Sequence, residues 1–178
     1  FVESKKKNST NAKPILKYST EGNFENLGVP CDNDIAISND GIYLSVVNSN
    51  ILAYDTKDDT LLFSLSLEAF ADTLGLTANM YDPKAIYDPT EDRFIMVWLS
   101  GNTDSTSNIV VAFSTSADPR DPWHLYALPG DPLEDGTWSD FPSVAITEGE
   151  LFITINALVN DTLPPNQIDS WKFLFKET

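Results

Sequence analysis

Three stretches of the chain share one pattern and decide the fold. They are DNDIAISNDGIYLSVVN over Asp32–Asn48, DPKAIYDPTEDRFIMVW over Asp82–Trp98 and DFPSVAITEGELFITIN over Asp140–Asn156. The three align without a gap, and their first residues lie 50 and 58 positions apart. In each unit, two runs of apolar and β-branched residues flank turn-forming residues, which indicates a strand, a tight turn and a second strand.

The sequence around these units completes a four-stranded repeat. After the middle unit come two more apolar runs, IVVAFSTS and WHLYALP, before the next aspartate. Four strands per repeat is typical of a β-propeller blade, so we expect an all-β chain of four-stranded antiparallel blades. The expected strands, about eleven, are Asp34–Ser38, Ile42–Val47, Ile51–Tyr54, Leu61–Leu67, Ala85–Tyr87, Phe94–Leu99, Ile109–Ser114, His124–Leu128, Val144–Ile146, Leu151–Ile155 and Trp171–Phe175.

One helix and two regions complete the expected organisation. The window Leu67–Leu74 has apolar residues at helical spacing, with Ser66 as N-cap and Gly75 as the closing glycine. We expect residues 1–22 to form an extended basic arm or linker and residues 23–178 to form the propeller segment, with units that begin near Asp32, Asp82 and Asp140. About two and a half to three blades are present, whereas propellers typically have four to eight. We therefore expect either the N-terminal part of a larger ring or a sheet edge that another polypeptide covers.

Composition excludes several function classes. The chain has 27 Asp and Glu against 11 Lys and Arg, a formal charge of -16, which opposes binding to nucleic acid. No apolar run approaches the roughly 20 residues of a membrane span. Cys31 and His124 are the only cysteine and histidine, so no disulfide within the chain and no multi-histidine or multi-cysteine metal centre is expected.

The chain resembles a known family in its most specific segments. These are the DP-x-x-x-YD-x-x-x-x-RF segment at Asp82–Phe94, the AFS-x-S-x-DP segment that leads to Trp123, and the DFP segment at Asp140. They are similar to consecutive blades of large secreted bacterial β-propeller proteins that are common among Bacteroidota. The resemblance implies secretion or display on the extracellular side of the outer membrane, often by type IX secretion, and it implies no catalytic residues.

Three aspartates are the candidate metal ligands. Asp32, Asp82 and Asp140 begin the first strand of each unit, and if that strand is innermost their carboxylates would line one mouth of the channel. Such a ring could bind Ca²⁺, which prefers several oxygen ligands. The alternative is structural: each carboxylate accepts backbone N–H bonds and fixes the turn before its strand.

A second motif surrounds Pro119. Ser116, Asp118 and Trp123 keep the spacing of the Asp-box turn of sialidase-like propellers, where the motif is structural, although Arg120 occupies the usual glycine position. Sialidase chemistry needs three arginines on a carboxylate, and this chain has only Arg93 and Arg120.

Other charged residues indicate structural roles. Arg93 begins an apolar strand, where we expect a salt bridge to a nearby aspartate. The acidic pairs of the chain are expected in solvated turns rather than in a glycosidase site; they are Asp58 with Asp59, Asp88 with Asp92, and Glu134 with Asp135.

These observations favour a non-enzymatic secreted or surface propeller that binds proteins or acts as a scaffold. Cargo or an accessory subunit of a bacterial surface or secretion complex would fit this description. Partners would meet the loops at one mouth, the open sheet edge, or the basic arm at Lys5, Lys6 and Lys7. The alternative is a carbohydrate-active hydrolase or lyase whose site lies partly in other blades. A third possibility is a segment held within a larger complex.

Overall fold

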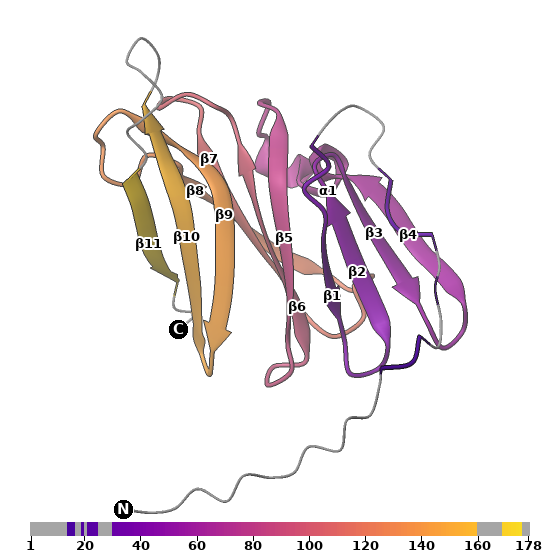
Figure 1. The fold of residues 1–178 in the computed structure, drawn as a ribbon. Coiled ribbons are helices and arrows are strands. Elements are labelled where there is room, and N and C mark those ends of the chain that lie inside the picture. Colours follow the sequence, from indigo (N-terminus) through magenta and orange to yellow (C-terminus); the bar gives the residue numbers. More distant parts are fainter. Residues whose placement is uncertain (1–13, 17–18, 20, 25–29, 160–168, 176–178) are drawn as a thin grey trace, which may run out of the picture.

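The chain folds into three antiparallel β-sheets (Figure 1). The computed structural model describes residues 14–16, 19, 21–24 and 30–159, and the backbone of 169–175. Sheet 1 contains β1 (Asp34–Ile37), β2 (Ile42–Val47), β3 (Asn50–Asp55) and β4 (Thr60–Ser66). Sheet 2 contains β5 (Met80–Asp88), β6 (Arg93–Ser100), β7 (Asn108–Ser114) and β8 (Trp123–Pro129). Sheet 3 contains β9 (Thr137–Thr147), β10 (Glu150–Val159) and β11 (Asp169–Phe175).

The expected strands are confirmed in number and order. Within sheets 1 and 2 each strand pairs with its neighbour in sequence, so both are four-stranded meanders. Most of the predicted arm, residues 1–13, lies outside the described residues. Asn23, just after the arm, ties this region to sheet 1 because its amide donates to the carbonyl oxygens of Ser45 (2.9 Å) and Asn50 (3.0 Å).

Two first strands are longer than the sequence predicts. β5 and β9 begin several residues before the expected Ala85 and Val144, and each contains a proline, Pro83 or Pro142. The pairing of β5 with β6 shifts register between Tyr81 and Lys84, and β9 has a matching irregularity. A bulge accommodates a proline inside a strand because the missing N–H is not needed there. The Asp-Pro and Phe-Pro pairs therefore lie within the strands.

Strand pairing corrects the gapless alignment of the three units. Every sheet has a residue of positive φ at the matching place near the start of its first strand, and these residues are Asp32 (φ 42°), Asp82 (φ 52°) and Phe141 (φ 48°). Asp140 instead matches Tyr81. Tyr81 pairs with Leu99 of β6, Asp140 pairs with Asn156 of β10, and Leu99 and Asn156 are each the first paired residue after the point where the register shifts.

The ends of the second strands shift as well. Asn48 donates its backbone N–H to Cys31, the residue before Asp32, at 3.0 Å. Asn48 therefore matches Leu99 and Asn156, and the predicted match to Trp98 is wrong by one residue. The cause lies in the hairpins, whose last paired residues are Ile37 with Tyr43, Asp88 with Arg93 and Thr147 with Glu150.

The predicted helix forms but is divided. It consists of α1 (Leu67–Phe70) and a 3₁₀ turn, η1 (Asp72–Leu74). The Ser66 hydroxyl accepts the Ala69 N–H at 3.1 Å, and Gly75 closes the segment with φ 65°. Phe70 packs edge-on against Trp98 and Trp123, with ring centroids 6.0 and 5.2 Å apart. The helical segment thus fills space between sheets 1 and 2 beside β4 and β8.

Two apolar layers join the sheets face to face. The first contains Leu44 and Val46 of sheet 1 with Phe94, Met96 and Trp98 of sheet 2. The second layer contains the residues of β6 that alternate with those of the first layer, together with residues of β10. Its members from β6 and β10 are Ile95, Val97, Leu99, Leu151, Ile153, Ile155 and Ala157. Sheet 2 is therefore buried on both faces, and nearly every residue of β6 is fully buried.

The first strands of successive sheets lie together. β1 contacts β5, and β5 contacts β9, so the sheets meet along these strands (Figure 1). The part of the chain that the structure describes forms an open stack without a closed barrel. Among the same residues, no helix has the length and apolar character needed to cross a membrane.

Two glycines of positive φ, Gly101 and Gly149, differ in how closely other backbone atoms approach them. A Cβ on Gly101 (φ 78°) would lie 2.1 Å from the Thr106 carbonyl oxygen, whereas a Cβ on Gly149 (φ 80°) would meet nothing within 4 Å. Gly149→Ala should cost about 1 kcal/mol for the left-handed backbone alone. Gly101→Ala should cost about 2–4 kcal/mol because overpacking adds to that strain. Urea unfolding measures both free energies, and equal losses would contradict the close approach.

Candidate functional site

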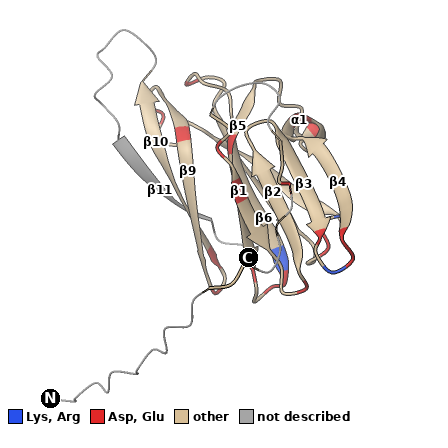
Figure 2. Cartoon of the chain, turned by 45° about the vertical axis from the view of Figure 1, so that its right-hand side comes forward, with Lys and Arg blue, Asp and Glu red and all other residues tan. Residues whose placement is uncertain are grey.

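The candidate site is a group of polar residues where the first strands begin, which we call the aspartate cluster: Asp32, Asp82, Asp140 and Asn48. Asp32 precedes β1, Asp82 lies in β5, and Asp140 lies in β9. Figure 2 shows acidic positions on β5 and β9, the neighbouring first strands of sheets 2 and 3. Residues 108 positions apart in sequence thus come together.

Asn48 connects sheets 1 and 2 within this cluster. Its amide nitrogen donates to Asp32 Oδ2 at 2.7 Å, which fixes the orientation of the amide. Its Oδ1 then accepts the backbone N–H of Asp82 at 2.6 Å. Because β5 is an edge strand, this N–H has no partner in its own sheet, and sheet 1 supplies the acceptor.

Sheets 2 and 3 are joined by a different side chain at the same place. The N–H of Phe141, which matches that of Asp82, donates to Asp82 Oδ2 at 3.0 Å. Leu99 occupies the position of Asn48 in sheet 2 and belongs to the apolar layer, so it cannot accept a hydrogen bond. The carboxylate of Asp82 is therefore the acceptor between sheets 2 and 3, as the amide of Asn48 is between sheets 1 and 2.

Two further contacts reinforce these junctions. The Ala85 N–H of β5 donates to Asp34 Oδ2 of β1 at 3.1 Å. The Tyr81 hydroxyl lies 2.7 Å from the Gly101 carbonyl oxygen and 3.0 Å from that of Ser139, where sheet 3 begins. Burial raises the pKa of this phenol, and the negative charges of Asp140 and Asp82 raise it further. Tyr81 therefore remains a neutral donor between the sheets.

The carboxylates of the cluster affect one another. Burial raises the pKa of Asp82 to about 6, and the charges of Asp140 and Asp32 add to this effect against the opposing Phe141 N–H bond. Burial also raises the pKa of Asp140, with a contribution from the charge of Asp32. The three predicted residues are thus brought close together, although Asp140 is not the structural counterpart of the other two.

The three aspartates of this cluster have two predicted roles, calcium binding and a structural role. Among the residues described, no group of three His, Cys, Asp or Glu side chains has an arrangement that could hold a metal ion. Asp32 accepts the side-chain amide of Asn48, and Asp82 accepts the backbone N–H of Phe141 in the following sheet, so these two bonds join strands rather than fix the turn before each strand. Calcium binding by Asp32, Asp82 and Asp140 stays a prediction.

The second predicted motif lies in the turn between β7 and β8. The Ser116 hydroxyl donates to Asp121 Oδ2 at 2.6 Å and accepts the Asp118 N–H at 3.0 Å. The Trp123 indole donates to the Pro119 carbonyl at 2.9 Å. Arg120, at the position usual for glycine, forms an ion pair with Asp118 at 2.6 Å, which lowers the pKa of that carboxyl. The side chains of this motif thus bond within the turn itself.

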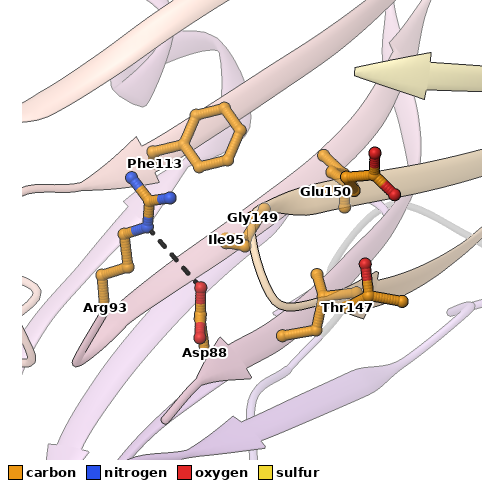
Figure 3. A pocket seen from close by; sticks show the side chains of 9 residues that line it. Asp88, Arg93, Ile95, Phe113, Thr147, Gly149 and Glu150 are labelled. Carbon is orange, nitrogen blue, oxygen red and sulfur yellow. Dashed lines mark ion pairs between the residues drawn. The ribbon is translucent and has the colours of Figure 1, made fainter. Parts of the chain in front are cut away.

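A small cavity lies between sheets 2 and 3 (Figure 3). It has a volume of about 20 Å³, enough for a single water molecule, and Arg93, Asp88 and Phe113 line one side. Arg93 Nε lies 3.9 Å from Asp88 Oδ2, and the guanidinium carbon lies 4.9 Å from the Phe113 ring centroid. The predicted salt bridge of Arg93 is confirmed, and the cavity is too small for a sugar or peptide.

Most residues of the acidic pairs lie in turns, but Asp88 is the buried last residue of β5, so the expected solvated turn is wrong for Asp88. Asp88 Oδ1 accepts the Thr90 N–H at 2.9 Å, and the Asp92 carboxylate accepts the Tyr87 hydroxyl. Asp59 accepts the hydroxyl of Tyr54 in the same way in the turn between β3 and β4. These carboxylates fix hairpin turns.

Sequence reasoning missed three residues that form the junctions. Asn48 was noticed only as the end of a unit, although a polar residue at the end of an apolar strand was a usable signal. Phe141 gave no signal, because aromatic residues rarely adopt positive φ. The hydroxyl bonds of Tyr81 to Gly101 and Ser139 could not be derived from spacing.

No family model matches the chain, and searches of curated proteins and of solved structures also find no significant match.

The raised pKa of Asp82 predicts a pH dependence of stability. The folded state binds this proton more tightly than the unfolded state, whose carboxyl titrates near 3.9, so stability from this group falls as pH rises from about 4 to 6. Asp82→Asn keeps an acceptor for the Phe141 N–H and removes the charge. The free energy of unfolding of Asp82→Asn relative to wild type should therefore increase between pH 4 and pH 7.

The matched control is Asp58→Asn, at an exposed turn position. Its free energy relative to wild type should stay constant over the same range in urea unfolding experiments. A constant difference for Asp82→Asn as well would contradict the raised pKa of Asp82, whose main cause is burial.

Proposed function

We propose that this chain is a series of consecutive blades of a secreted or surface β-propeller that acts as a non-enzymatic protein-binding scaffold. One observation carries the proposal. Three sheets of the same strand order stack face to face in chain order, with their first strands together. This arrangement is what a segment of a propeller requires.

The chemistry of the described residues supports a scaffold. The carboxylates of Asp32, Asp82, Asp88 and Asp118 accept hydrogen bonds from backbone or side-chain groups that fix strands and turns. The cavity beside Arg93 has room for only about one water molecule. Rigid turns on a fixed stack of sheets are well suited to binding a protein surface, since little order is lost on binding.

Charge suggests the kind of partner. The whole chain has a formal charge of -16, and acidic positions occur on first strands and turns (Figure 2). A basic protein surface would complement this charge and associate faster at low ionic strength. We therefore propose a partner with a basic contact surface, in a secreted or surface complex.

A carbohydrate-active hydrolase or lyase is the second candidate, and one observation favours it. The pKa of Asp82 is about 6, Asp140 lies close by with a pKa that burial also raises, and a pair of carboxyl groups that includes one with a raised pKa is what glycoside hydrolysis uses. Against this role, Asp82 is buried and its Oδ2 accepts the Phe141 N–H. Such a bond suits a structural carboxylate.

Fractionation and cross-linking of the protein from its source test the proposal. A carbodiimide, which joins carboxyl groups to lysine amines, suits a contact between a chain with 27 Asp and Glu and a basic partner surface. We expect the protein in the medium or surface fraction, cross-linked to one partner at constant stoichiometry, and less partner at high salt. A cytoplasmic location would contradict the proposal.

The two candidate functions are separated by activity. Hydrolysis or elimination of a polysaccharide that Asp82→Asn and Asp140→Asn both abolish, while both variants melt like wild type, would establish the enzyme and overturn the scaffold. A calcium titration of wild type and Asp82→Asn by calorimetry tests the metal prediction on the same proteins.

A further inference from the structure

The outer face of sheet 3, which lies outside the two apolar layers, has residues at the same strand positions as the faces that form those layers. We call the face of a sheet that points toward the next sheet along the chain its front. The fronts of sheets 1 and 2 carry Leu44 and Ile95 at matched positions, with exposures of 0% and 2%. The matched residue on the front of sheet 3 is Phe152, which is 37% exposed. The position that is buried at both described junctions is open on sheet 3.

The neighbouring position follows the same rule. Val46 and Val97 are fully buried on the fronts of sheets 1 and 2. Thr154, their counterpart in β10, is partly exposed. The front of sheet 3 thus has the register of a junction without a sheet against it among the described residues.

Asn156 supplies the polar part of a junction on this face. It matches Asn48, which accepts the Asp82 N–H of the following sheet. In sheet 2 the matching residue is Leu99, and Asp82 replaces the missing acceptor. In sheet 3 the residue at the place of Asp82 is Phe141, which has no side-chain acceptor. Asn156 is therefore the acceptor that remains, and its amide forms no hydrogen bond with any other residue whose side chain is described.

We propose that the front of sheet 3 is the docking face for a further sheet of the same polypeptide, and that Asn156 accepts a backbone N–H from the first strand of that sheet. The occupant follows from the order of the described sheets, because each sheet packs on the front of the sheet that precedes it in sequence. Its first strand would carry a residue of positive φ, as Asp82 and Phe141 do. This inference rests on the proposed propeller function.

Cysteine labelling of the protein as its source makes it tests the docking face. In a Cys31→Ser background, Phe152→Cys reports on the front of sheet 3, and Asp58→Cys reports on an exposed turn. A maleimide should modify Cys at position 58 at the rate of a free thiol and Cys at position 152 at least about tenfold more slowly. Equal rates would overturn the proposal.

Dilution separates the sources of protection. A covering sheet of the same polypeptide protects position 152 equally at all protein concentrations. Protection that disappears on dilution would mean that a second molecule covers the face, and it would overturn the proposal in its stated form.

Asn156→Leu tests the hydrogen bond itself. Leucine is the residue that sheet 2 carries at this position, but sheet 3 has no carboxylate to compensate for it. Loss of this hydrogen bond leaves a buried backbone donor without an acceptor and loosens the covering sheet, so labelling at position 152 should become at least about fivefold faster. Thr154→Val, on the same face, should leave the rate unchanged. Equal rates for the two variants would overturn the assigned role of Asn156.

The outcomes distinguish this inference from the proposed function. A reactive cysteine at position 152 in a secreted protein that binds its partner overturns the docking face alone. A protected cysteine in a protein that cleaves a polysaccharide overturns the scaffold function alone.

Discussion

The backbone N–H groups on the free edges of β5 and β9 impose the constraint on which the stack depends. The edge strand of a sheet has donors without partners, and a buried donor without an acceptor costs about 1–3 kcal/mol. Here the preceding sheet supplies the acceptors: Asn48 and Asp34 for β5, and Asp82 for β9. Each sheet therefore fixes where the next one begins.

These polar contacts set the position of apolar faces that have little directional preference of their own. Hydrophobic burial is nearly proportional to area and does not by itself select a register. A shift of one residue would reverse which residues of β6 point toward sheet 1 and which toward sheet 3. Because Asn48 and Asp82 bond to single backbone groups, they restrict the sheets to the observed alignment. The raised pKa of Asp82 reflects the burial of a charge at this junction.

Sequence patterns predicted the strands and the helical segment, because apolar runs and turn residues are local signals. The caps Ser66 and Gly75 are also predicted from the sequence, and both lie where the sequence places them. The equivalence of the three units was predicted only to within one residue, since the hairpins between Ile37 and Tyr43 and between Thr147 and Glu150 differ in length. Spacing cannot reveal a bulge that compensates for such a difference.

The candidate site was predicted in part for the same reason. Asp32, Asp82 and Asp140 were expected to meet, and they do influence one another. The bonds that give Asp32 and Asp82 their roles involve Asn48 and the N–H of Phe141, which depend on a positive φ and on contacts between sheets. Neither property is encoded within a short window of sequence.

Amide hydrogen exchange at Asp82 and Phe141, resolved by nuclear magnetic resonance, tests the central claim most directly. Both amides should exchange as slowly as those of the buried strand β6, through unfolding of the whole stack. Exchange of either amide within seconds at neutral pH would show that it has no lasting acceptor. Such a result would contradict the account in which each sheet fixes the start of the next.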